Sequence, residues 1–164
     1  MLAIVTGISG QDGAYVAQEL LNKGVKVIGV IRNTSSSLKG LEYLNILNDI
    51  EIVLLNLGDS NQVDAFIKKK QPSYVFNLAA ESSVAESFKD PHRSILFNLR
   101  STLNLLESIR KYSSNSHFYQ ATSSEMFGSV ANLPITEETL LHPQSPYAIS
   151  KAACHHLVRN YRES

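Results

Sequence analysis

The sequence predicts a doubly wound α/β fold, in which helices cover both faces of a parallel sheet. Along the 164 residues, short apolar runs alternate with longer segments of helical periodicity. The runs are apolar on both faces, which is typical of buried parallel strands. A glycine-rich turn, TGISGQDG, follows the first run and leads into a helix. Right-handed crossovers between such strands produce a doubly wound sheet.

Each element follows from a local pattern. Apolar runs predict five strands, at residues 2–5, 25–31, 52–55, 74–78 and 117–122. Helical spacing of apolar residues predicts helices at residues 14–22, 41–47, 61–70, 92–112 and from about 146 onward. Gly24 and the Gln71-Pro72 pair are helix stops. The apolar residues of the longest helix that are expected to face the core are Ile95, Leu99, Leu103, Leu106 and Ile109.

The composition argues against several kinds of partner. The 15 basic and 15 acidic residues balance, so neither nucleic acid nor an anionic membrane is expected. Cys154 is the single cysteine and no Cys–His cluster has zinc spacing, so neither a disulfide nor a metal is expected. The N-terminus lacks a secretory signal, and no apolar run approaches the ~20 residues of a membrane helix. We therefore expect a cytoplasmic protein.

The glycine turn predicts a dinucleotide site. Its G-x-x-G-x-x-G spacing gives a tight turn and a bare backbone, with a helix N-terminus that can meet a pyrophosphate. Glycines also serve simple strand–helix turns, so this alternative remains. With the predicted sheet, the turn favours a Rossmann-like NAD(P)-binding domain over residues 1–164. The residues expected to contact the cofactor here are Gly7, Ile8, Ser9, Gly10, Gln11, Asp12 and Gly13.

The end of the second strand favours NADP over NAD. An NAD site usually has an acidic residue there, which holds the ribose hydroxyls. This chain has Arg32, followed by hydroxyl residues such as Ser35, and a guanidinium suits a 2′-phosphate. An arginine at the start of a loop can also be merely solvated, so NAD remains an alternative. Residues expected to border the cofactor after later strands are Asn56, Leu57, Leu78, Ala79, Ala80 and Ser82.

A catalytic group is predicted on the last helix. Tyr147 and Lys151 are four residues apart and therefore share one helix face. The ammonium of a nearby lysine favours the phenolate form of a tyrosine, which would make Tyr147 a better base. Such pairs occur by chance on many helices. Here the pair follows Ser123 at the end of a strand in a nucleotide-binding sheet, and this combination favours dehydrogenase-like chemistry.

On these residues the chain resembles the extended short-chain dehydrogenase/reductases that modify nucleotide sugars. It is most similar to the GDP-mannose 4,6-dehydratase family, over essentially all 164 residues. The matching stretches are TGISGQDG, NLAAESSVAESF, FYQATSSEMFG, PQSPYAISK and NYRES.

The resemblance implies a role for four side chains. Tyr147 would take the proton of the sugar's C4 hydroxyl while hydride passes to NADP, and Lys151 would orient the nicotinamide ribose. Ser123 would hydrogen-bond the C4 oxygen. Glu125 would remove the C5 proton and help to expel the C6 hydroxyl as water. The product would be GDP-4-keto-6-deoxymannose, and Tyr147 and Lys151 would also contact the cofactor.

Some residues depart from the family pattern, and other functions therefore remain as alternatives. Glu81 stands where the family usually has glutamine, which adds a negative charge unless it is protonated or paired, and Arg93 replaces a usual tyrosine. A reductase or epimerase of nucleotide sugars would use Ser123, Tyr147 and Lys151 while Glu125 merely caps a turn or meets solvent. A non-catalytic NADP-binding fragment is the third reading.

The resemblance also implies a longer architecture. Family members are about twice this length, as expected for a cofactor domain plus a substrate lobe. We therefore expect the chain to be an N-terminal portion without the substrate lobe. By itself this portion should bind NADP weakly and should not turn over a sugar nucleotide. In full-length form, a dimer or tetramer is expected, through residues 33–40 and the long helix after His92.

Overall fold

The computed structural model describes residues 1–130 and 133–164, and contacts divide them between two compact units. The first unit comprises Met1–Ala79 and Ser101–Ala121. The second comprises Ala80–Arg100 and Thr122–Ser164. The expectation of a single cofactor-binding domain over residues 1–164 stays a prediction.

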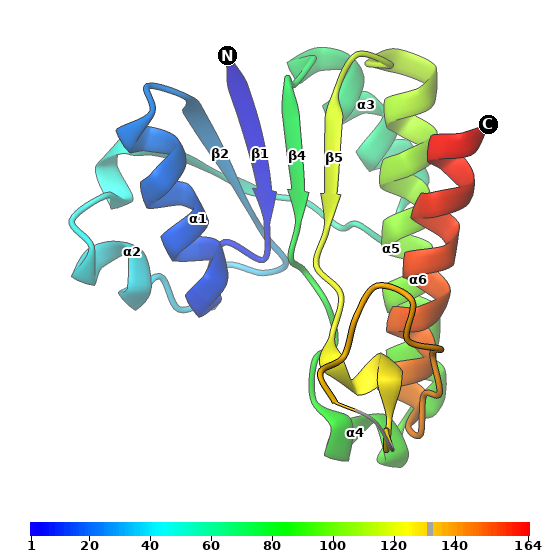
Figure 1. The fold of residues 1–164 in the computed structure, drawn as a ribbon. Helices are drawn as coiled ribbons and strands as arrows, with labels where there is room; N and C mark the ends of the chain where they lie inside the picture. The colour runs from blue at the N-terminus through cyan, green and yellow to red at the C-terminus, as the bar shows by residue number, and fades with distance from the viewer. Residues whose placement is uncertain (131–132) are drawn as a thin grey trace. The chain divides into compact units, whose positions relative to one another are not determined.

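The first unit is built on a five-stranded parallel sheet with the order β3-β2-β1-β4-β5 (Figure 1). The strand order reverses direction between β1 and β4, as in a doubly wound sheet, so the predicted fold class is confirmed. The strands are β1 (Leu2–Thr6), β2 (Lys26–Ile31), β3 (Ile50–Leu54), β4 (Tyr74–Asn77) and β5 (His117–Gln120).

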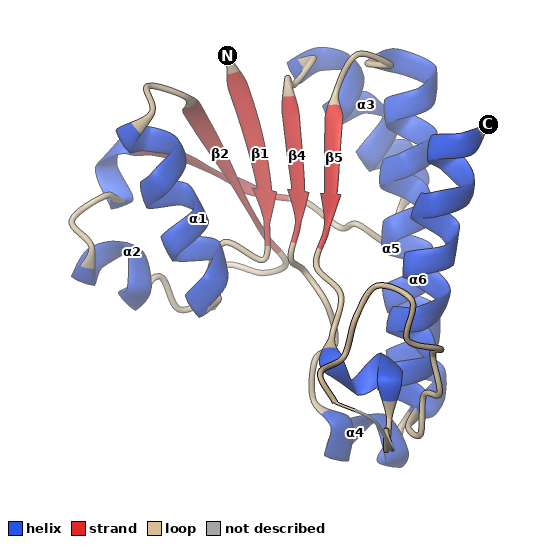
Figure 2. Ribbon diagram, viewed as in Figure 1, coloured by secondary structure: helices blue, strands red, loops and turns tan. Residues whose placement is uncertain are grey.

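Helices lie on both faces of this sheet (Figure 2). On one face, α1 (Gln11–Asn22) and α2 (Lys39–Tyr43) cover a core that includes Ala3, Val5 and Val27. On the other face, α3 (Ser60–Lys70) and residues 101–112 of α5 (Pro91–Tyr112) cover Ile4, Ile28 and Val75. Alternate residues of each strand point to opposite faces, so successive apolar residues of a strand fill both cores.

Capping explains where several helices begin. Asp59 is the N-cap of α3, and its side chain accepts hydrogen bonds from the backbone N–H groups of Asn61 and Gln62. Gln71 ends α3 in the left-handed conformation, as the predicted stop requires. Helix α1 begins at Gln11, three residues before the predicted start, because the glycine turn itself forms its first turn. Helix α2 is shorter than predicted, and a 3-10 turn (Leu47–Asp49) follows it.

The second unit contains α4 (Val84–Lys89), residues 91–100 of α5, a 3-10 turn η2 (Ser124–Phe127) and α6 (Pro146–Glu163). Both α4 and η2 pack against α6. Helix α6 begins where the sequence predicts, because the Ser145 hydroxyl accepts a hydrogen bond from the Ala148 N–H and Pro146 suits the first helical position. Helix α4 was not predicted, since six residues are too short to show a helical period.

The core-facing side of α5 differs from the prediction. Its fully buried residues are Ser94, Asn98, Ser101, Thr102, Leu105, Leu106, Ser108 and Ile109. The prediction that Leu103 faces the core is wrong, because its side chain is 40% exposed. Partners from other elements satisfy much of the buried polar stripe: Ser108 hydrogen-bonds Asp64, and Thr102 bonds Gln120.

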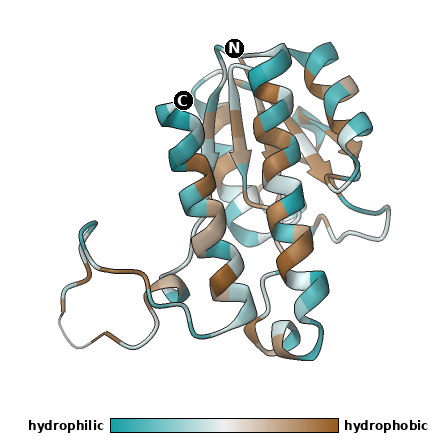
Figure 3. Ribbon diagram, turned by 90° about the vertical axis from the view of Figure 1, so that its right-hand side faces the viewer, coloured by the Kyte–Doolittle hydropathy of each residue, from teal (hydrophilic) through white to brown (hydrophobic). Residues whose placement is uncertain are grey.

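Hydrophobic and hydrophilic residues alternate along both long helices (Figure 3), and no helix in the described residues is long and apolar enough to cross a membrane.

Candidate functional site

The glycine turn of the first unit is shaped for a close approach of backbone. Gly7 has a φ of +70°, and a Cβ there would lie 2.8 Å from the Ala79 nitrogen, so only glycine fits. A Cβ on Gly13 would collide with the Gly7 carbonyl oxygen. Gly10 is the N-cap of α1 and provides no side chain to cap its first N–H groups. This bare helix N-terminus fits the pyrophosphate of a dinucleotide.

A hydroxyl network fixes the turn against the end of β4. The Thr6 hydroxyl accepts hydrogen bonds from the backbone N–H groups of Leu78 and Ala79, at 3.2 and 3.1 Å. The same hydroxyl donates to Asn77 Oδ1 at 2.7 Å. Three predicted cofactor residues, Gly7, Leu78 and Ala79, therefore lie together at the carboxyl edge of the sheet, which is where ligands bind in open α/β sheets.

The other predicted cofactor residues of this unit form two groups, one with exposed side chains and one with buried side chains. Ser9, Gln11 and Asp12 are exposed beside the start of α1, so their side chains can reach a ligand. Ile8 and Leu57 are buried in the two cores at 0% and 4% exposure, so only their backbone could contact a cofactor. Asn56 is exposed, and its Oδ1 accepts a hydrogen bond from the Gly58 N–H at 3.0 Å, which stabilises the turn after β3.

The loop after β2 carries an exposed cation and ordered hydroxyls. Arg32 is exposed directly after the strand. Asn33 Oδ1 accepts hydrogen bonds from the hydroxyls of Ser35 and Ser36, at 2.9 and 3.2 Å. Asn33 therefore orders the two serines within the loop that begins at Arg32. A cation beside hydroxyl groups can bind a phosphate.

In the second unit, η2 presents Ser123 and Glu125. Ser123 is the N-cap of η2, and its hydroxyl accepts a hydrogen bond from the Glu125 N–H at 3.3 Å. A hydroxyl that accepts one bond can still donate its proton to another oxygen. Glu125 is exposed, and within the described residues no cation or hydrogen-bond donor engages its carboxylate. Met126 anchors the turn, since it is 3% exposed and its carbonyl accepts a bond from the His142 N–H.

Tyr147 and Lys151 lie on the buried face of α6. They are 8% and 4% exposed, and the Lys151 Nζ lies 5.9 Å from the centroid of the Tyr147 ring. At this distance the ammonium interacts with the face of the ring. Because η2 packs against the same helix, all four predicted catalytic residues belong to one compact unit. The remaining predicted cofactor residues of this unit are Ala80, which is half-buried, and Ser82, which is exposed.

Burial lowers the pKa of the Lys151 ammonium below its ordinary value of 10.5, and Cys154 has a smaller, opposite effect. Between the lowered pKa and 10.5 the unfolded chain binds more protons than the folded chain. The free energy of unfolding of the wild-type chain therefore rises as pH rises through that window. Below the window Lys151 is charged in the folded chain, and the full cost of burying that charge lowers the stability.

We expect Lys151→Met to raise the melting temperature near neutral pH, because it removes a buried charge and keeps the side-chain length. Each kcal/mol regained raises the melting temperature by about 2–4 °C in a domain of this size. The gain should shrink as pH rises toward 10.5. Thermal unfolding at several pH values checks this, with the exposed Lys69→Met as control. A gain from Lys151→Met that grows with pH would contradict the expected sign.

Asn98 is a structural hub that the sequence reasoning missed. Its side chain accepts from the Glu81 N–H at 2.9 Å and donates to the Glu81 carbonyl at 3.3 Å and to the Ser150 hydroxyl at 2.8 Å. Ser150 in turn donates to the Tyr147 carbonyl. Asn98 thus joins the segment that holds Ala80 and Ser82 to the helix that holds Tyr147 and Lys151. The signal in the sequence was an amide three residues after Ile95, at a core-facing helical spacing.

Comparison with known proteins identifies the family. The family model described as GDP-mannose 4,6 dehydratase matches residues 4–164. The chain belongs to the GDP-mannose 4,6-dehydratase family. A GDP-mannose 4,6-dehydratase of Yersinia enterocolitica is 39% identical over 99% of this chain, and one of Arabidopsis thaliana is 40% identical over 99%. The chain spans 46% of the length of each of these relatives.

Solved structures with the same fold include nucleotide-sugar epimerases. The UDP-glucose 4-epimerase of Thermotoga maritima, solved with UDP-glucose, has a TM-score of 0.89 and 28% identity, and the match covers 100% of this chain and 52% of that one. The UDP-glucose 4-epimerase of Bifidobacterium longum, solved with NAD⁺ and UDP, has a TM-score of 0.88 and 29% identity, covering 98% of this chain and 48% of that one.

Glu81 and Arg93, which are both expected to depart from the family pattern, form an ion pair. The carboxylate of Glu81 lies 3.0 Å from the guanidinium of Arg93. The negative charge that Glu81 adds is therefore balanced within the second unit. Since the side chains are 25% and 60% exposed, the pair contributes little to stability, and charge neutrality is its main consequence.

Proposed function

We propose that this protein is a nucleotide-sugar 4,6-dehydratase that converts GDP-mannose to GDP-4-keto-6-deoxymannose, with residues 1–164 as its cofactor-binding half. The observation that carries the proposal is the presence of Ser123, Glu125, Tyr147 and Lys151 on two packed elements of one unit. Family membership supports the choice of reaction.

Each of the four side chains has its own role in the proposed reaction. Ser123 donates a hydrogen bond to the C4 oxygen, and Tyr147 takes the C4 hydroxyl proton as a general base. Lys151 lies against the Tyr147 ring and would hold the cofactor ribose. Glu125 takes the C5 proton, which the new C4 ketone has made acidic, and returns it to the departing C6 hydroxyl, so that water leaves. When bound, NADP would supply the hydride acceptor at C4 and the hydride donor at C6. The proton that Tyr147 took from the C4 hydroxyl would go to C5 as the hydride reaches C6, which restores the phenolate.

Product analysis tests this proposal. The protein expressed from its complete reading frame is incubated with GDP-mannose and NADP, and the sugar nucleotide is analysed by mass spectrometry and NMR. A dehydratase gives a product that has lost one water and carries a C4 ketone. A nucleotide-sugar epimerase, the alternative suggested by the solved structures, gives an isomer of unchanged mass. A reductase, which in this mixture can only run in reverse, converts NADP to its reduced form in amounts equal to product. Either of these two results would overturn the proposal.

The cofactor is proposed to be NADP, with Arg32 as the residue that selects its 2′-phosphate. We expect Arg32→Ala to weaken NADP binding by about 10- to 100-fold, the range for losing hydrogen bonds to a charged group. NAD binding should change by less than about twofold. Calorimetric titration of both cofactors checks this, with Lys26→Ala at the opposite end of β2 as the control. Equal losses for NADP and NAD would refute the selection by Arg32.

The proposal includes self-association of the complete protein as a dimer or tetramer. Helix α5 carries two leucines with exposed side chains, Leu96 at 60% and Leu103 at 40%. They are seven residues apart, so they lie on the same side of the helix. Such a pair offers apolar area that a second copy of the chain could bury. Sedimentation of the complete protein measures the oligomeric state.

A further inference from the structure

A small pocket in the second unit is lined by acids and serines. Its volume is about 120 Å³, whereas a single water needs only ~10–15 Å³, so a small organic group fits inside. We call it the serine pocket. It lies among residues of α4 and the first turn of α5, and its lining includes Glu81, Glu86, Ser87, Asp90, Arg93 and Ser94.

Ser94 gives the serine pocket a buried hydroxyl without a partner. Its side chain is 3% exposed, and no described residue makes a hydrogen bond with its Oγ atom. Buried polar groups are normally paired, and an unpaired one lowers stability. Ser87 is 1% exposed and donates its hydroxyl proton to the Val84 carbonyl at 2.7 Å, so its oxygen can still accept a bond. The buried part of the pocket therefore offers two hydroxyl oxygens to a ligand.

The exposed rim of the serine pocket has an excess of negative charge. Arg93 pairs with Glu81 at 3.0 Å, and Glu86 pairs with Lys89 at 2.7 Å. Asp90 uses its Oδ1 to accept a hydrogen bond from the Arg93 backbone N–H at 2.9 Å. Within the described part of the chain, no cation pairs with the Asp90 carboxylate. One negative charge at the rim is therefore available to a positively charged ligand.

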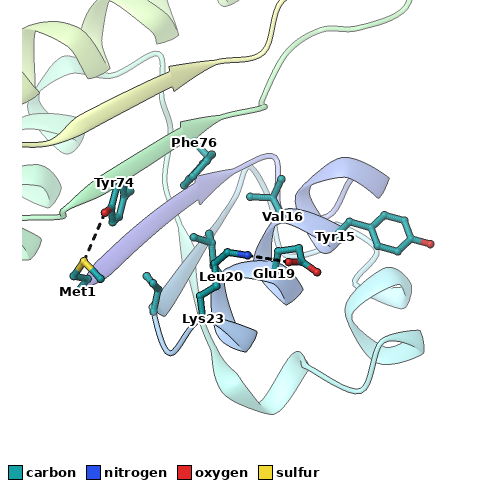
Figure 4. Close-up of a pocket in the computed structure, with 9 residues that line it drawn as sticks. Met1, Tyr15, Val16, Glu19, Leu20, Lys23, Tyr74 and Phe76 are labelled. Carbon is teal, nitrogen blue, oxygen red and sulfur yellow. Dashed lines mark hydrogen bonds and ion pairs between the residues drawn. The ribbon is translucent and has the colours of Figure 1, made fainter.

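The larger cavity of the first unit offers no comparable charge. It has a volume of about 560 Å³, and residues of α1 and β4 form most of its mainly apolar lining (Figure 4). Its two charged residues, Glu19 and Lys23, pair with each other at 3.2 Å, as the dashed line in Figure 4 shows. A charged ligand is therefore expected in the serine pocket and not in this cavity.

A primary ammonium group matches the chemistry of the serine pocket. It has N–H donors and no acceptor, so hydroxyl and carboxylate oxygens are its natural partners. A metal ion would need several charged ligands to converge, and among the residues that the structure describes no three His, Cys, Asp or Glu side chains could hold one. The volume of the pocket also suits a small organic cation.

We propose that the serine pocket binds the ammonium group of a small primary amine, with the Ser94 hydroxyl at its buried end and the Asp90 carboxylate at its rim. The bound ammonium would give Ser94 the partner that it lacks and balance the charge of Asp90. Glu81, which also lines the pocket, stands between the predicted cofactor residues Ala80 and Ser82. This inference does not depend on the proposed dehydratase chemistry.

Ligand-observed NMR of the complete protein tests the proposal, with methylammonium as the probe. Its methyl signal should broaden in a saturable way in the presence of the protein. Tetramethylammonium, which has the same charge but no N–H donor, should show no saturable effect. Ser94→Ala should weaken methylammonium binding at least about tenfold, the effect of losing a hydrogen bond to a charged group. Ser108→Ala is the control, since Ser108 is also fully buried but bonds Asp64 outside the pocket.

Thermal unfolding provides a second readout. Without amine, Ser94→Ala should melt at the wild-type temperature or above it, because the substitution removes an unpaired buried hydroxyl. Methylammonium should raise the melting temperature of the wild-type protein by mass action and that of Ser94→Ala by less, with sodium chloride as the control for ionic strength. Four results would overturn the proposal: no saturable binding, equal binding of tetramethylammonium, an unchanged affinity of Ser94→Ala, or a lower melting temperature of Ser94→Ala without amine.

Discussion

Tyr147→Phe is expected to lower kcat for GDP-mannose dehydration by about 10²- to 10⁴-fold, the usual contribution of a positioned general base. The substitution removes one oxygen atom and keeps the ring, which is 8% exposed and lies against the Lys151 ammonium. The fold should therefore persist. The C4 hydroxyl proton would have no acceptor while hydride leaves, so the first oxidation would limit the rate.

The measurement is the steady-state rate of the complete protein with GDP-mannose, together with the melting temperature of each variant. Tyr43→Phe is the matched control, since it removes the same oxygen from an exposed ring on α2. NADP binding should fall by much less than kcat, because the phenol acts mainly in the transition state. A Tyr147→Phe protein that keeps its full rate would exclude Tyr147 as the base.

Glu125→Gln is expected to stop water release while C4 oxidation continues. The neutral amide cannot take the C5 proton, so formation of the 4-keto-6-deoxy sugar should fall by about 10²- to 10⁴-fold. Tyr147, Lys151 and Ser123 remain intact, so the first hydride transfer should proceed. Reduced nicotinamide should therefore accumulate in a single turnover of the variant, at a level that the wild-type protein does not reach.

Rapid-quench product analysis and nicotinamide absorbance measure the two steps separately. The control is Glu137→Gln, an exposed acid in the loop after η2. The amide is close in size to the carboxylate, and Glu125 is exposed and held by its own backbone N–H, so η2 should keep its conformation. A variant that still releases water at the wild-type rate would remove Glu125 from the mechanism and favour the reductase or epimerase reading.

Much of the fold could be predicted because its signals are local. Five apolar runs separated by helical segments specify the parallel sheet, and the structure has strands at all five places. Most boundaries agree to within three residues, and the shifts arise because helix ends depend on caps such as Gly10 and Asp59. The start of α6 was predictable because Ser145 and Pro146 are a cap and a first-turn residue in direct succession.

The candidate site was predictable only where spacing along the chain determines geometry. Tyr147 and Lys151 share a face because residues four apart on a helix always do. Gly7 was predictable because a tight turn requires a positive φ, which the structure has at +70°. By contrast, the spacing of Asn98 from Ile95 indicated a buried amide but not its partners, because Ser150 lies 52 residues beyond Asn98 along the chain.

The sequence by itself therefore determined the strand and helix pattern, the glycine turn and the catalytic pair, because backbone periodicity and turn chemistry act over a few residues. The tertiary structure alone decided which face of α5 is buried, that Glu81 is neutralised by Arg93, and that Tyr119 of β5 is exposed. Those outcomes depend on partners that are distant in sequence. Burial and hydrogen bonding are properties of the assembled surfaces, and the local sequence pattern does not contain them.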